Sequence, residues 1–567
     1  MKKRYSIIAL ALLAVLGTNA AERTAQQKRA IAMSVLGSKT ARANVAINEL
    51  KVMNELTVMG GNGVGFAVIS NDDRNEAVLA VANNDFNAEN IPDGLQWWLD
   101  AVNASLEDGN GYTRETRAVP AGLPETVAPM LTCTWGQGEP FNRLCPMDGN
   151  SRSLTGCVAT AMAQIMYYHK YPTHGQGTKY DTYNHTQIDF SQQTYDYANM
   201  KDSYLDGSYS DAQASAVATL MYHCGLTVDM VYSHISSGSH GILAAQAVAT
   251  YFGYNKNVAC RMRDGHSDSD WSQMIYEELA AGRPILYSGT DVSMGGHAFV
   301  FTGYDAEGKV YVNWGWEGEA DGYYDFNILD PHPYENSYAF TSGQNMLTGF
   351  ATADENIPHV SEVVWYSNDP NDQGLRMSTR GSSYIIPNLT GCSVANYNWY
   401  DFTGKIHVIA EGNDGVMHSL GNYDFASNFI PMIYRDGDAY SIGLGFFTQG
   451  DIACNTRDLA NGTYTVYLGV QDSGYDEITP MSFGEGKTSR YTLTKTDDGI
   501  TLDAQPATGI ANAVVDTTAD DGMAHVYTAS GVEVYSAPAS SFNINDVPMN
   551  GLLIIKKGGE TTKVMKK

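Results

Sequence analysis

The sequence predicts a chain of several domains, with α+β units first and all-β units after them, and three observations support this. The 567 residues exceed what a single apolar core usually accommodates. Up to residue 360, apolar residues at helical spacing alternate with short strand-like runs, which is typical of helices packed on an antiparallel sheet. From residue 361 the helical spacing disappears and strand-like runs alternate with Gly, Asn and Asp turns, which indicates a β-sandwich.

Residues 1–20 are expected to form a secretory signal peptide. The basic residues 2–4 precede an apolar run at 7–16, and the small residues at 18–20 suit cleavage. The alternative is a buried N-terminal helix. The apolar run is too short to span a bilayer, and no later stretch approaches about 18 apolar residues. We therefore expect an exported protein without a stable membrane span.

Composition disfavours one class of partner. The chain has 35 Lys and Arg against 63 Asp and Glu, a net charge of −28, and no long basic run, so nucleic acid is not an expected partner. Seven cysteines, an odd number in an exported chain, leave at least one unpaired thiol. The remaining six could form disulfides that the sequence does not assign, and no CxxC pair suggests zinc.

The N-terminal unit, residues 21–118, is predicted to be a separate α+β unit. Helices are expected at 26–36 and 95–106, and strands at 65–70 and 77–82. Asp93 is expected to cap the second helix. A polar, glycine-rich linker at 109–120 follows, in which Arg114 and Arg117 are either processing sites or ordinary solvated charges.

Three further units are predicted. The central domain, residues 119–360, is expected to be α+β, with a helix over 158–169 and short strands at 299–301, 310–312 and 323–326. The β-sandwich module, residues 361–505, has strand-like runs at 404–410, 441–447 and 463–470. The C-terminal unit, residues 506–567, is expected to be a small β domain.

Cys157 and His297 are the most informative residues for function. Cys157 follows Thr-Gly and precedes a helical run, where the positive end of the helix dipole lowers a thiol pKa. His297 follows two glycines and lies 140 positions later (297 − 157). A thiolate beside an imidazole is a strong nucleophile with its own base. The alternatives are a structural cysteine and a core histidine; a second Thr-Gly-Cys, ending at Cys392, lacks a following helix and is interpreted as structural.

Residues near Cys157 and His297 in the sequence motifs complete a candidate thiol site. Asn313 is expected to orient the imidazole through its second nitrogen. Trp314, like Trp316, is expected to shield the histidine or stack on it, the alternative being plain core aromatics. Gln137 is expected to donate its amide to an oxyanion, together with the backbone N–H of Cys157.

The order Gln, Cys, His and Asn-Trp resembles that of the papain-like cysteine peptidases, in which Cys and His are separated by about 130–150 residues. The residue sequences of several segments resemble those of the streptopain family. These segments are TGCVATAMAQIMYYHKYP (155–172), SSGS (236–239), GGHAFVFTGYD (295–305), VNWGWEGEADGYY (312–324), GFAVISNDDRNEAVLAVA (65–82) and LQWWLDAV (95–102). The C-terminal unit resembles the sorting domain of type IX secretion cargo.

These resemblances imply a secreted zymogen, with a papain-like fold in the central domain and an inhibitory propeptide in the N-terminal unit. By position they imply Cys157 as nucleophile, His297 as general base and then acid, Gln137 in the oxyanion hole, Trp314 supporting the histidine with Asn313 beside it, and Ser239 and Gly296 lining the substrate cleft. They imply no metal or organic cofactor. The expected partners are protein substrates, the chain's own propeptide and an export machinery that delivers the protein to the cell surface or medium, across the outer membrane.

Two other functions are compatible with these residues. The same Cys–His chemistry serves acyl transfer to amines, as in transglutaminase-like enzymes. An inactive adhesin that binds proteins through its β units is the second alternative, and the presence of Gln137, Cys157 and His297 argues against it.

Overall fold

The structure is a computed structural model. It describes residues 22–505, together with parts of 523–566, except for 44, 108–118, 292–294, 327–341, 368, 370, 426–428, 433, 437–438, 442, 448–451 and 485. The expected signal peptide, Arg114 and Arg117 lie outside the described residues. Within the described part, no helix is long and apolar enough to cross a membrane.

The N-terminal unit and the central domain share one antiparallel sheet of ten strands, in the order β1-β2-β3-β4-β13-β12-β11-β10-β14-β9. The strands are β1 (Asn48–Val52), β2 (Leu56–Gly61), β3 (Gly65–Ser70), β4 (Val78–Ala82), β9 (Ala259–Met262), β10 (Ile285–Asp291), β11 (Gly295–Tyr304), β12 (Val310–Asn313), β13 (Gly322–Tyr324) and β14 (Ser342–Thr348). The two parts of the sheet are joined by the antiparallel pairing of β4, from the N-terminal unit, with β13, from the central domain, where Val81 lies opposite Tyr323. The N-terminal unit is therefore hydrogen-bonded into the central domain, which the sequence did not predict.

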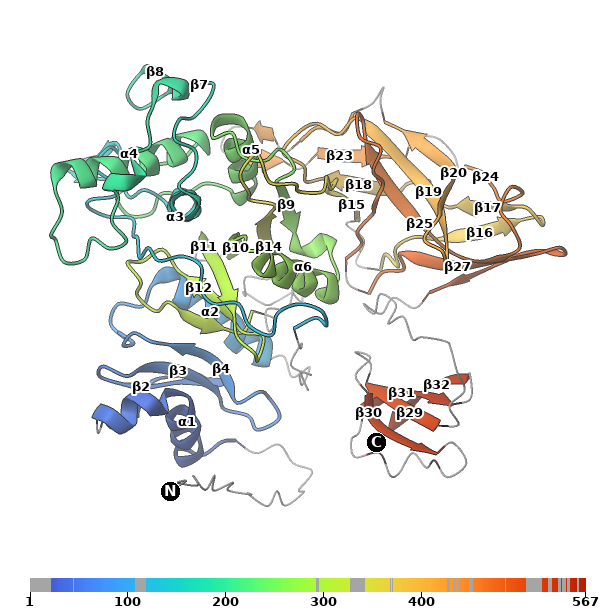
Figure 1. Ribbon diagram of the computed structural model, residues 1–567, viewed down its shortest axis with the longest axis horizontal. Helices are drawn as coiled ribbons and strands as arrows, with labels where there is room; N and C mark the ends of the chain where they lie inside the picture. Colours follow the sequence, from blue (N-terminus) through green and yellow to red (C-terminus); the bar gives the residue numbers. More distant parts are fainter. Residues whose placement is uncertain are drawn as a thin grey trace, which may run out of the picture.

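Helices cover both faces of this sheet (Figure 1). They are α1 (Ala25–Ala43), α2 (Asp93–Glu107), α3 (Cys157–His169), α4 (Asp211–Thr227), α5 (Gly241–Tyr251) and α6 (Asp268–Ala280), with single 3₁₀ turns η1 (Phe190–Gln192), η2 (Tyr197–Asn199) and η3 (Arg263–Gly265). Two hairpins lie outside the sheet, β5 (Met147–Asp148) with β6 (Ser151–Arg152) and β7 (Thr178–Asp181) with β8 (Thr186–Asp189).

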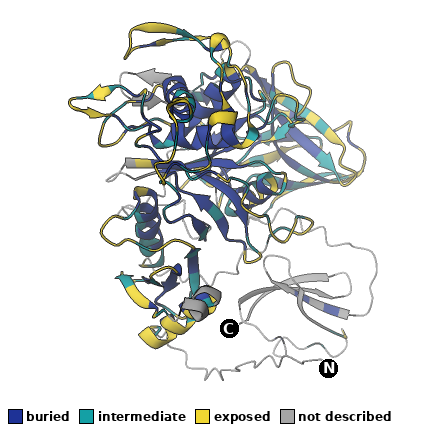
Figure 2. Cartoon of the chain, turned by 60° about the vertical axis from the view of Figure 1, so that its left-hand side comes forward, coloured by how far each residue is buried: buried dark blue, intermediate teal, exposed yellow. Residues whose placement is uncertain are grey.

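Alternation along the strands divides the interior into two cores. In β11, Ala298 and Val300 belong to the core that α3, α4 and α5 cover. Phe299 and Phe301 belong to the core that α2 and α6 cover. Successive side chains of a strand point to opposite faces, which explains this division. Figure 2 shows the buried residues gathered along the central sheet and helices, with exposed residues in the peripheral loops.

The β-sandwich module is all-β; most of its buried apolar side chains form one core, and Val364, Ala395 and Tyr397 belong to a smaller one. Three of its sheets have the orders β15-β18-β23, β16-β17-β24 and β20-β19-β25-β27-β28, with β26 paired to β25; β21 and β22 form a hairpin. The strands are β15 (Val363–Tyr366), β16 (Met377–Arg380), β17 (Tyr384–Pro387), β18 (Ser393–Asn396), β19 (Gly404–Gly412), β20 (Met417–Asp424), β21 (Tyr434–Asp436), β22 (Ala439–Ser441), β23 (Gly443–Phe446), β24 (Cys454–Asn455), β25 (Gly462–Asp472), β26 (Thr479–Pro480), β27 (Arg490–Thr496) and β28 (Gly499–Ala504).

A buried charge cluster attaches this module to the central domain. Glu362 accepts hydrogen bonds from Arg261 and His266 of the central domain. Burial raises the pKa of the Glu362 carboxyl, but the interactions with Arg261 and His266 outweigh burial and bring it to about 2. The carboxylate is therefore ionised, and removing either partner leaves a buried charge incompletely compensated.

The C-terminal unit contributes a four-stranded antiparallel sheet in the order β30-β29-β31-β32. Its strands are β29 (Met523–Thr528), β30 (Glu533–Pro538), β31 (Gly551–Lys557) and β32 (Glu560–Lys566). Its sorting role stays a prediction. All seven cysteines of the chain lie among the described residues, and none of them forms a disulfide.

Candidate active site

Helix α3 begins at Cys157 because Gly156 turns the chain sharply into it. Gly156 has φ 86° and ψ 142°, a conformation that side chains disfavour. A Cβ at this position would lie 2.5 Å from the sulfur of Met230. The Gly156 carbonyl then accepts from the backbone N–H and the hydroxyl of Thr160, each at 3.0 Å. This turn places the Cys157 side chain at the positive end of the helix.

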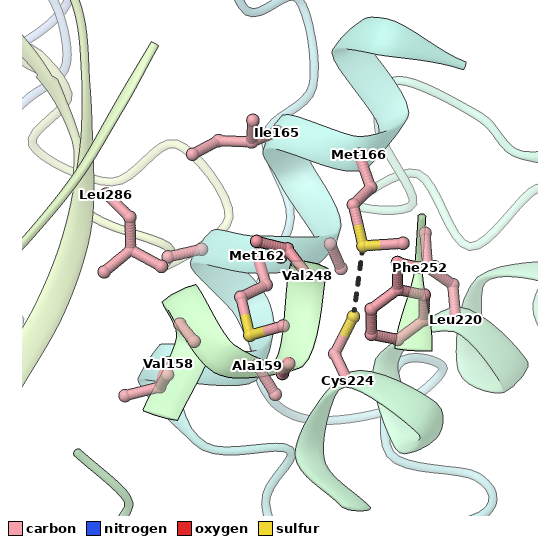
Figure 3. Close-up of a cluster of buried hydrophobic side chains, with 14 of the residues drawn as sticks. Val158, Ala159, Met162, Ile165, Met166, Leu220, Cys224, Val248, Phe252 and Leu286 are labelled. Atoms are coloured by element: carbon pink, nitrogen blue, oxygen red, sulfur yellow. Dashed lines mark hydrogen bonds between the residues drawn. The ribbon is translucent and has the colours of Figure 1, made fainter. Parts of the chain in front are cut away.

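The body of α3 is anchored in the apolar core (Figure 3). Val158, Met162 and Met166 pack among side chains of other elements, including Leu286 of β10. The thiol of Cys224 on α4 approaches the sulfur of Met166 at 3.6 Å. Because the helix is packed along its length, the position of Cys157 is fixed by the core and not by its own side chain.

His297 lies on β11, opposite Gly289 of β10. Its Nε2 lies 3.1 Å from the carbonyl oxygen of Trp314. A carbonyl oxygen only accepts, so Nε2 carries the hydrogen and Nδ1 is left for another partner. The indole of Trp316 stacks on the imidazole, with ring centroids 6.2 Å apart and planes inclined by 23°.

The other partner of the imidazole is the Cys157 thiol, to which it is joined by a side-chain hydrogen bond. Burial raises the pKa of Cys157, but His297 and the backbone N–H groups of Ala298 and Val158 outweigh burial, so the thiol pKa lies below its ordinary value. Burial lowers the pKa of His297, but Cys157, the Trp314 carbonyl and Asp93 raise it above its ordinary value. The opposite shifts favour a thiolate–imidazolium pair.

Gln137 is buried beside the turn that leads into α3. Its backbone carbonyl accepts from the N–H of Thr155 at 3.1 Å, two residues before Cys157. Only 6% of the Gln137 residue is exposed, so its side-chain amide lies inside the fold near the start of α3. The structure thus brings Gln137 and Cys157 into one part of the fold.

The side chain of Asn313 does not contact the imidazole by hydrogen bonding, contrary to the expectation from the sequence. Its Nδ2 donates to the carbonyl of Cys133 at 2.9 Å. Its Oδ1 accepts from Gln164 and from the backbone N–H of Gly315, both at 3.0 Å. The carbonyl of Trp314, one residue further along, is the direct partner of His297.

Asp321 supports the same loop, a role that was not expected from the sequence. Its Oδ1 accepts from the backbone N–H of Trp314 at 2.9 Å. Burial raises the pKa of the Asp321 carboxyl to about 7, although the Trp314 N–H opposes this shift. A carboxyl between Ala320 and Gly322, close to the aromatic pair Tyr323 and Tyr324, was the available signal for a buried acid.

The two residues expected in the substrate cleft, Ser239 and Gly296, both lie between Cys157 and His297 in the sequence. Gly296 is exposed, directly before His297, and pairs with Thr290 of β10. Ser239 is half-buried and donates to the carbonyl of Val228. Its loop approaches the nucleophile, because the Ser237 hydroxyl donates to the Leu154 carbonyl at 2.8 Å.

The N-terminal unit reaches this site through α2. A Cβ built on Gly94 would lie 2.5 Å from Cδ2 of His297 and 2.6 Å from Cε3 of Trp314. Asp93, the first residue of α2, acts electrostatically on the imidazole. From the sequence, Asp93 was expected only to cap the helix; the glycine directly after it was the signal for a close approach.

Comparisons with known proteins show which family this part of the chain resembles. The family model described as Peptidase C10 family matches residues 135–324, a span that contains Gln137, Cys157, His297 and Trp314. The chain is similar to the thiol protease/hemagglutinin PrtT of Porphyromonas gingivalis, with 31% identity over 364 residues, which is 57% of this chain and 40% of PrtT. The chain thus spans less than half the length of that relative.

Two further similarities concern shorter proteins. Streptopain of Streptococcus pyogenes is 33% identical over 294 residues, which is 47% of this chain and 72% of streptopain. A solved structure of a Prevotella intermedia prointerpain A fragment, in which a cysteine is replaced by alanine, is 37% identical with a TM-score of 0.50. That similarity covers 55% of this chain and 100% of the fragment.

Proposed function

The chain belongs to the peptidase C10 family of cysteine peptidases, the family of streptopain, and from this premise we propose that it is the precursor of a secreted cysteine endopeptidase. The proposal assigns peptide-bond hydrolysis to the central domain. It assigns self-inhibition to the N-terminal unit and export to the signal peptide expected at residues 1–20 and the C-terminal unit.

In the proposed mechanism, the Cys157 thiolate attacks the carbonyl carbon of the scissile peptide bond. The oxyanion of the tetrahedral intermediate accepts from the Gln137 amide and the Cys157 backbone N–H. The His297 imidazolium then protonates the leaving amine, and the carbon–nitrogen bond breaks to leave an acyl-enzyme. Neutral His297 next takes a proton from water, which attacks the thioester, releases the new carboxyl end and restores the thiolate.

The observation that carries this proposal is the hydrogen bond between Cys157 and His297, with the two pKa values displaced in opposite directions. A structural cysteine in an apolar core has a raised thiol pKa instead, because burial alone disfavours the charged thiolate. Cys224 is such a case, since burial raises its pKa well above the ordinary value.

Self-inhibition is supported by the position of the N-terminal unit. The first turn of α2 lies on His297 and Trp314. The unit is held there by the pairing of β4 with β13 and by α2 residues such as Trp98 in the shared core. A substrate that needs the space beside the imidazole competes with Gly94, so removal of the unit would open the site.

Incubation of the purified precursor, with and without reductant and a thiol-directed epoxide inhibitor, tests the proposal. We expect reductant-dependent cleavage within the chain that the inhibitor blocks, and sequencing of the new N-termini reports the processing site. The Cys157→Ala precursor is the matched control and should stay intact. Cleavage of that variant at the same rate would contradict the proposal.

The same preparation separates the two alternatives. An acyltransferase joins an added primary amine to a substrate and forms isopeptide bonds, whereas an endopeptidase releases free termini. An inactive adhesin does neither and is not labelled by the epoxide.

A further inference from the structure

The side chain of Asn313 is buried and makes three hydrogen bonds, although it does not touch the reacting groups. Its amide lies between three partners, Cys133, Gln164 and Gly315, at 2.9 to 3.0 Å. The Cys133 carbonyl can only accept and the Gly315 N–H can only donate, so these two contacts fix the orientation of the Asn313 amide. Burying an amide costs free energy unless it is hydrogen-bonded, and these three contacts offset that cost while they hold the Asn313 side chain in one place.

The peptide group between Trp314 and Gly315 connects Asn313 to His297. Its N–H, on Gly315, donates to Oδ1 of Asn313 at 3.0 Å. Its carbonyl, on Trp314, accepts from Nε2 of His297 at 3.1 Å. The peptide group is planar and rigid, so fixing its N–H also fixes the direction of its carbonyl oxygen.

Hydrogen bonds in such a chain reinforce one another. When the N–H of a peptide group donates, its carbonyl oxygen becomes a better acceptor. The His297 Nε2–H therefore meets an oxygen that is both aimed and polarised by Asn313. This arrangement stabilises the imidazolium, because the charged ring donates more strongly than the neutral ring.

The chain of hydrogen bonds also returns to the helix that carries the nucleophile. Gln164 lies seven positions after Cys157 on α3 (164 − 157), about two helical turns along. Its Nε2 donates to the same Oδ1 of Asn313, and its Oε1 has no partner among the described residues. The side chain is therefore held there as a donor to Asn313.

We propose that Asn313 is a positioning residue for His297 that acts through the Trp314–Gly315 peptide group, and that Gln164 ties this relay to the helix bearing Cys157. The inference rests on the proposed peptidase function and deepens it. An orienting amide acts on the imidazole here across one intervening peptide group, where the sequence suggested direct contact.

The pH dependence of kcat/KM of the mature enzyme, on a peptide substrate, tests this relay. Asn313→Ala leaves the Trp314 carbonyl less well aimed, so we expect kcat to fall by about tenfold with KM within about twofold. The alkaline limb of the kcat/KM profile should shift to lower pH by about one unit, because the Trp314 carbonyl then stabilises the imidazolium less. The acid limb should shift up, because the thiolate loses part of its counter-charge.

The other charged groups near His297 are the same in the wild-type and variant mature enzymes, so they do not cause a difference between the pH profiles. Cys157 faces the imidazole from α3 and is present in every variant. Asp93 faces it from α2 and is absent once the N-terminal unit is removed. Asp321 lies behind Trp314 and stays in place.

Two further variants separate positioning from simple structural support. Gln164→Met keeps the length of the side chain and removes one donor to Asn313, so we expect a smaller shift of both limbs in the same directions. Asn255→Ala, after α5, removes a half-buried amide that donates to the carbonyl of Glu355 far from the site, and should leave both limbs unchanged.

If neither limb of the kcat/KM profile shifts in the Asn313→Ala and Gln164→Met enzymes, the proposed relay is wrong, whatever the stability of these variants. If Asn313→Ala does not fold, the Gln164→Met profile decides alone. Failure of the peptidase function itself would look different, because the wild-type enzyme would then show no hydrolysis while alkylation of Cys157 still reports its pKa.

Discussion

The tripeptide Thr-Gly-Cys occurs twice in this chain, at 155–157 in the central domain and at 390–392 in the β-sandwich module. Both glycines have positive φ, 86° at Gly156 and 81° at Gly391. After Gly156 the chain enters α3, whereas after Gly391 it enters the strand β18. The same three residues therefore lead into two different elements, and the helix or strand that they enter decides the surroundings of the sulfur.

The surroundings differ in chemistry as well as in structure. Cys157 is hydrogen-bonded to an imidazole and to two backbone N–H groups, which lower its pKa against the effect of burial. The sulfur of Cys392 approaches the carbonyl oxygen of Asn388 at 3.8 Å, an acceptor that does not stabilise a thiolate. A reactive cysteine is thus a property of the surrounding fold and not of a short motif.

The largest expected difference between the two regions is in activity. Cys157→Ala removes the nucleophile and should lower kcat/KM for peptide hydrolysis by about 10⁴-fold or more. Cys392→Ala should leave kcat/KM within about twofold. Activity assays of both variants at equal concentrations of folded protein check this, and a comparable loss in both would break the distinction.

The imidazole provides the next test. His297→Ala removes the base and the counter-charge, so we expect a loss of about 10³-fold in kcat and a rise in the Cys157 pKa, because burial is then less opposed. Thiolate absorbance against pH measures that rise. His407→Ala, at a buried histidine of β19, is the matched control and should change neither quantity.

The two glycines allow a sharper comparison. Alanine at either position meets an unfavourable positive φ, which costs about 1 kcal/mol. Only at Gly156 would the new Cβ also collide, with Met230, since nothing lies within 4 Å of a Cβ on Gly391. We expect Gly156→Ala to displace Cys157 and lower kcat/KM by about 10²-fold. Gly391→Ala should lower the melting temperature only slightly and leave activity intact; equal effects would contradict the packing account.

The smallest expected effect on activity comes from Asp321. Its pKa is raised by burial to about 7, so the protonated form is favoured by folding. The stability it contributes is fully present below the ordinary carboxyl pKa and is lost as pH rises toward about 7. Asp321→Asn keeps the acceptor for Trp314 and should raise the free energy of unfolding at pH 8 by about 1–3 kcal/mol, with kcat within about threefold. Denaturant titrations at pH 5 and pH 8 measure this, and an equal effect at both would contradict the assigned pKa.

Local patterns predicted much of this molecule correctly. β3 spans Gly65–Ser70 as expected, α3 begins one residue before the predicted helix, and α2 spans Asp93–Glu107 around the predicted run. Each of these elements has a periodic apolar pattern bounded by glycine or a capping residue. The change from α+β to all-β architecture was visible for the same reason.

The features that the sequence missed depend on contacts between distant segments. The pairing of β4 with β13 leaves no local signal, because strand partners are selected by the whole sheet. The role of a backbone carbonyl, such as that of Trp314 toward His297, does not depend on the type of side chain and is invisible in residue identity. Asn313 was expected to hold the imidazole directly, but its hydrogen bonds go to segments far away in the chain, such as Cys133 and Gln164.

The central claim is that one of the seven cysteines, Cys157, is a thiolate in the folded protein near neutral pH. Labelling the folded precursor and its processed form at pH 6 with a thiol-directed epoxide, followed by peptide mapping, tests this directly. We expect the label on Cys157 of the processed form alone, with little on Cys392 and little on the precursor. Label at Cys392 or at a buried cysteine in preference to Cys157 would contradict the account.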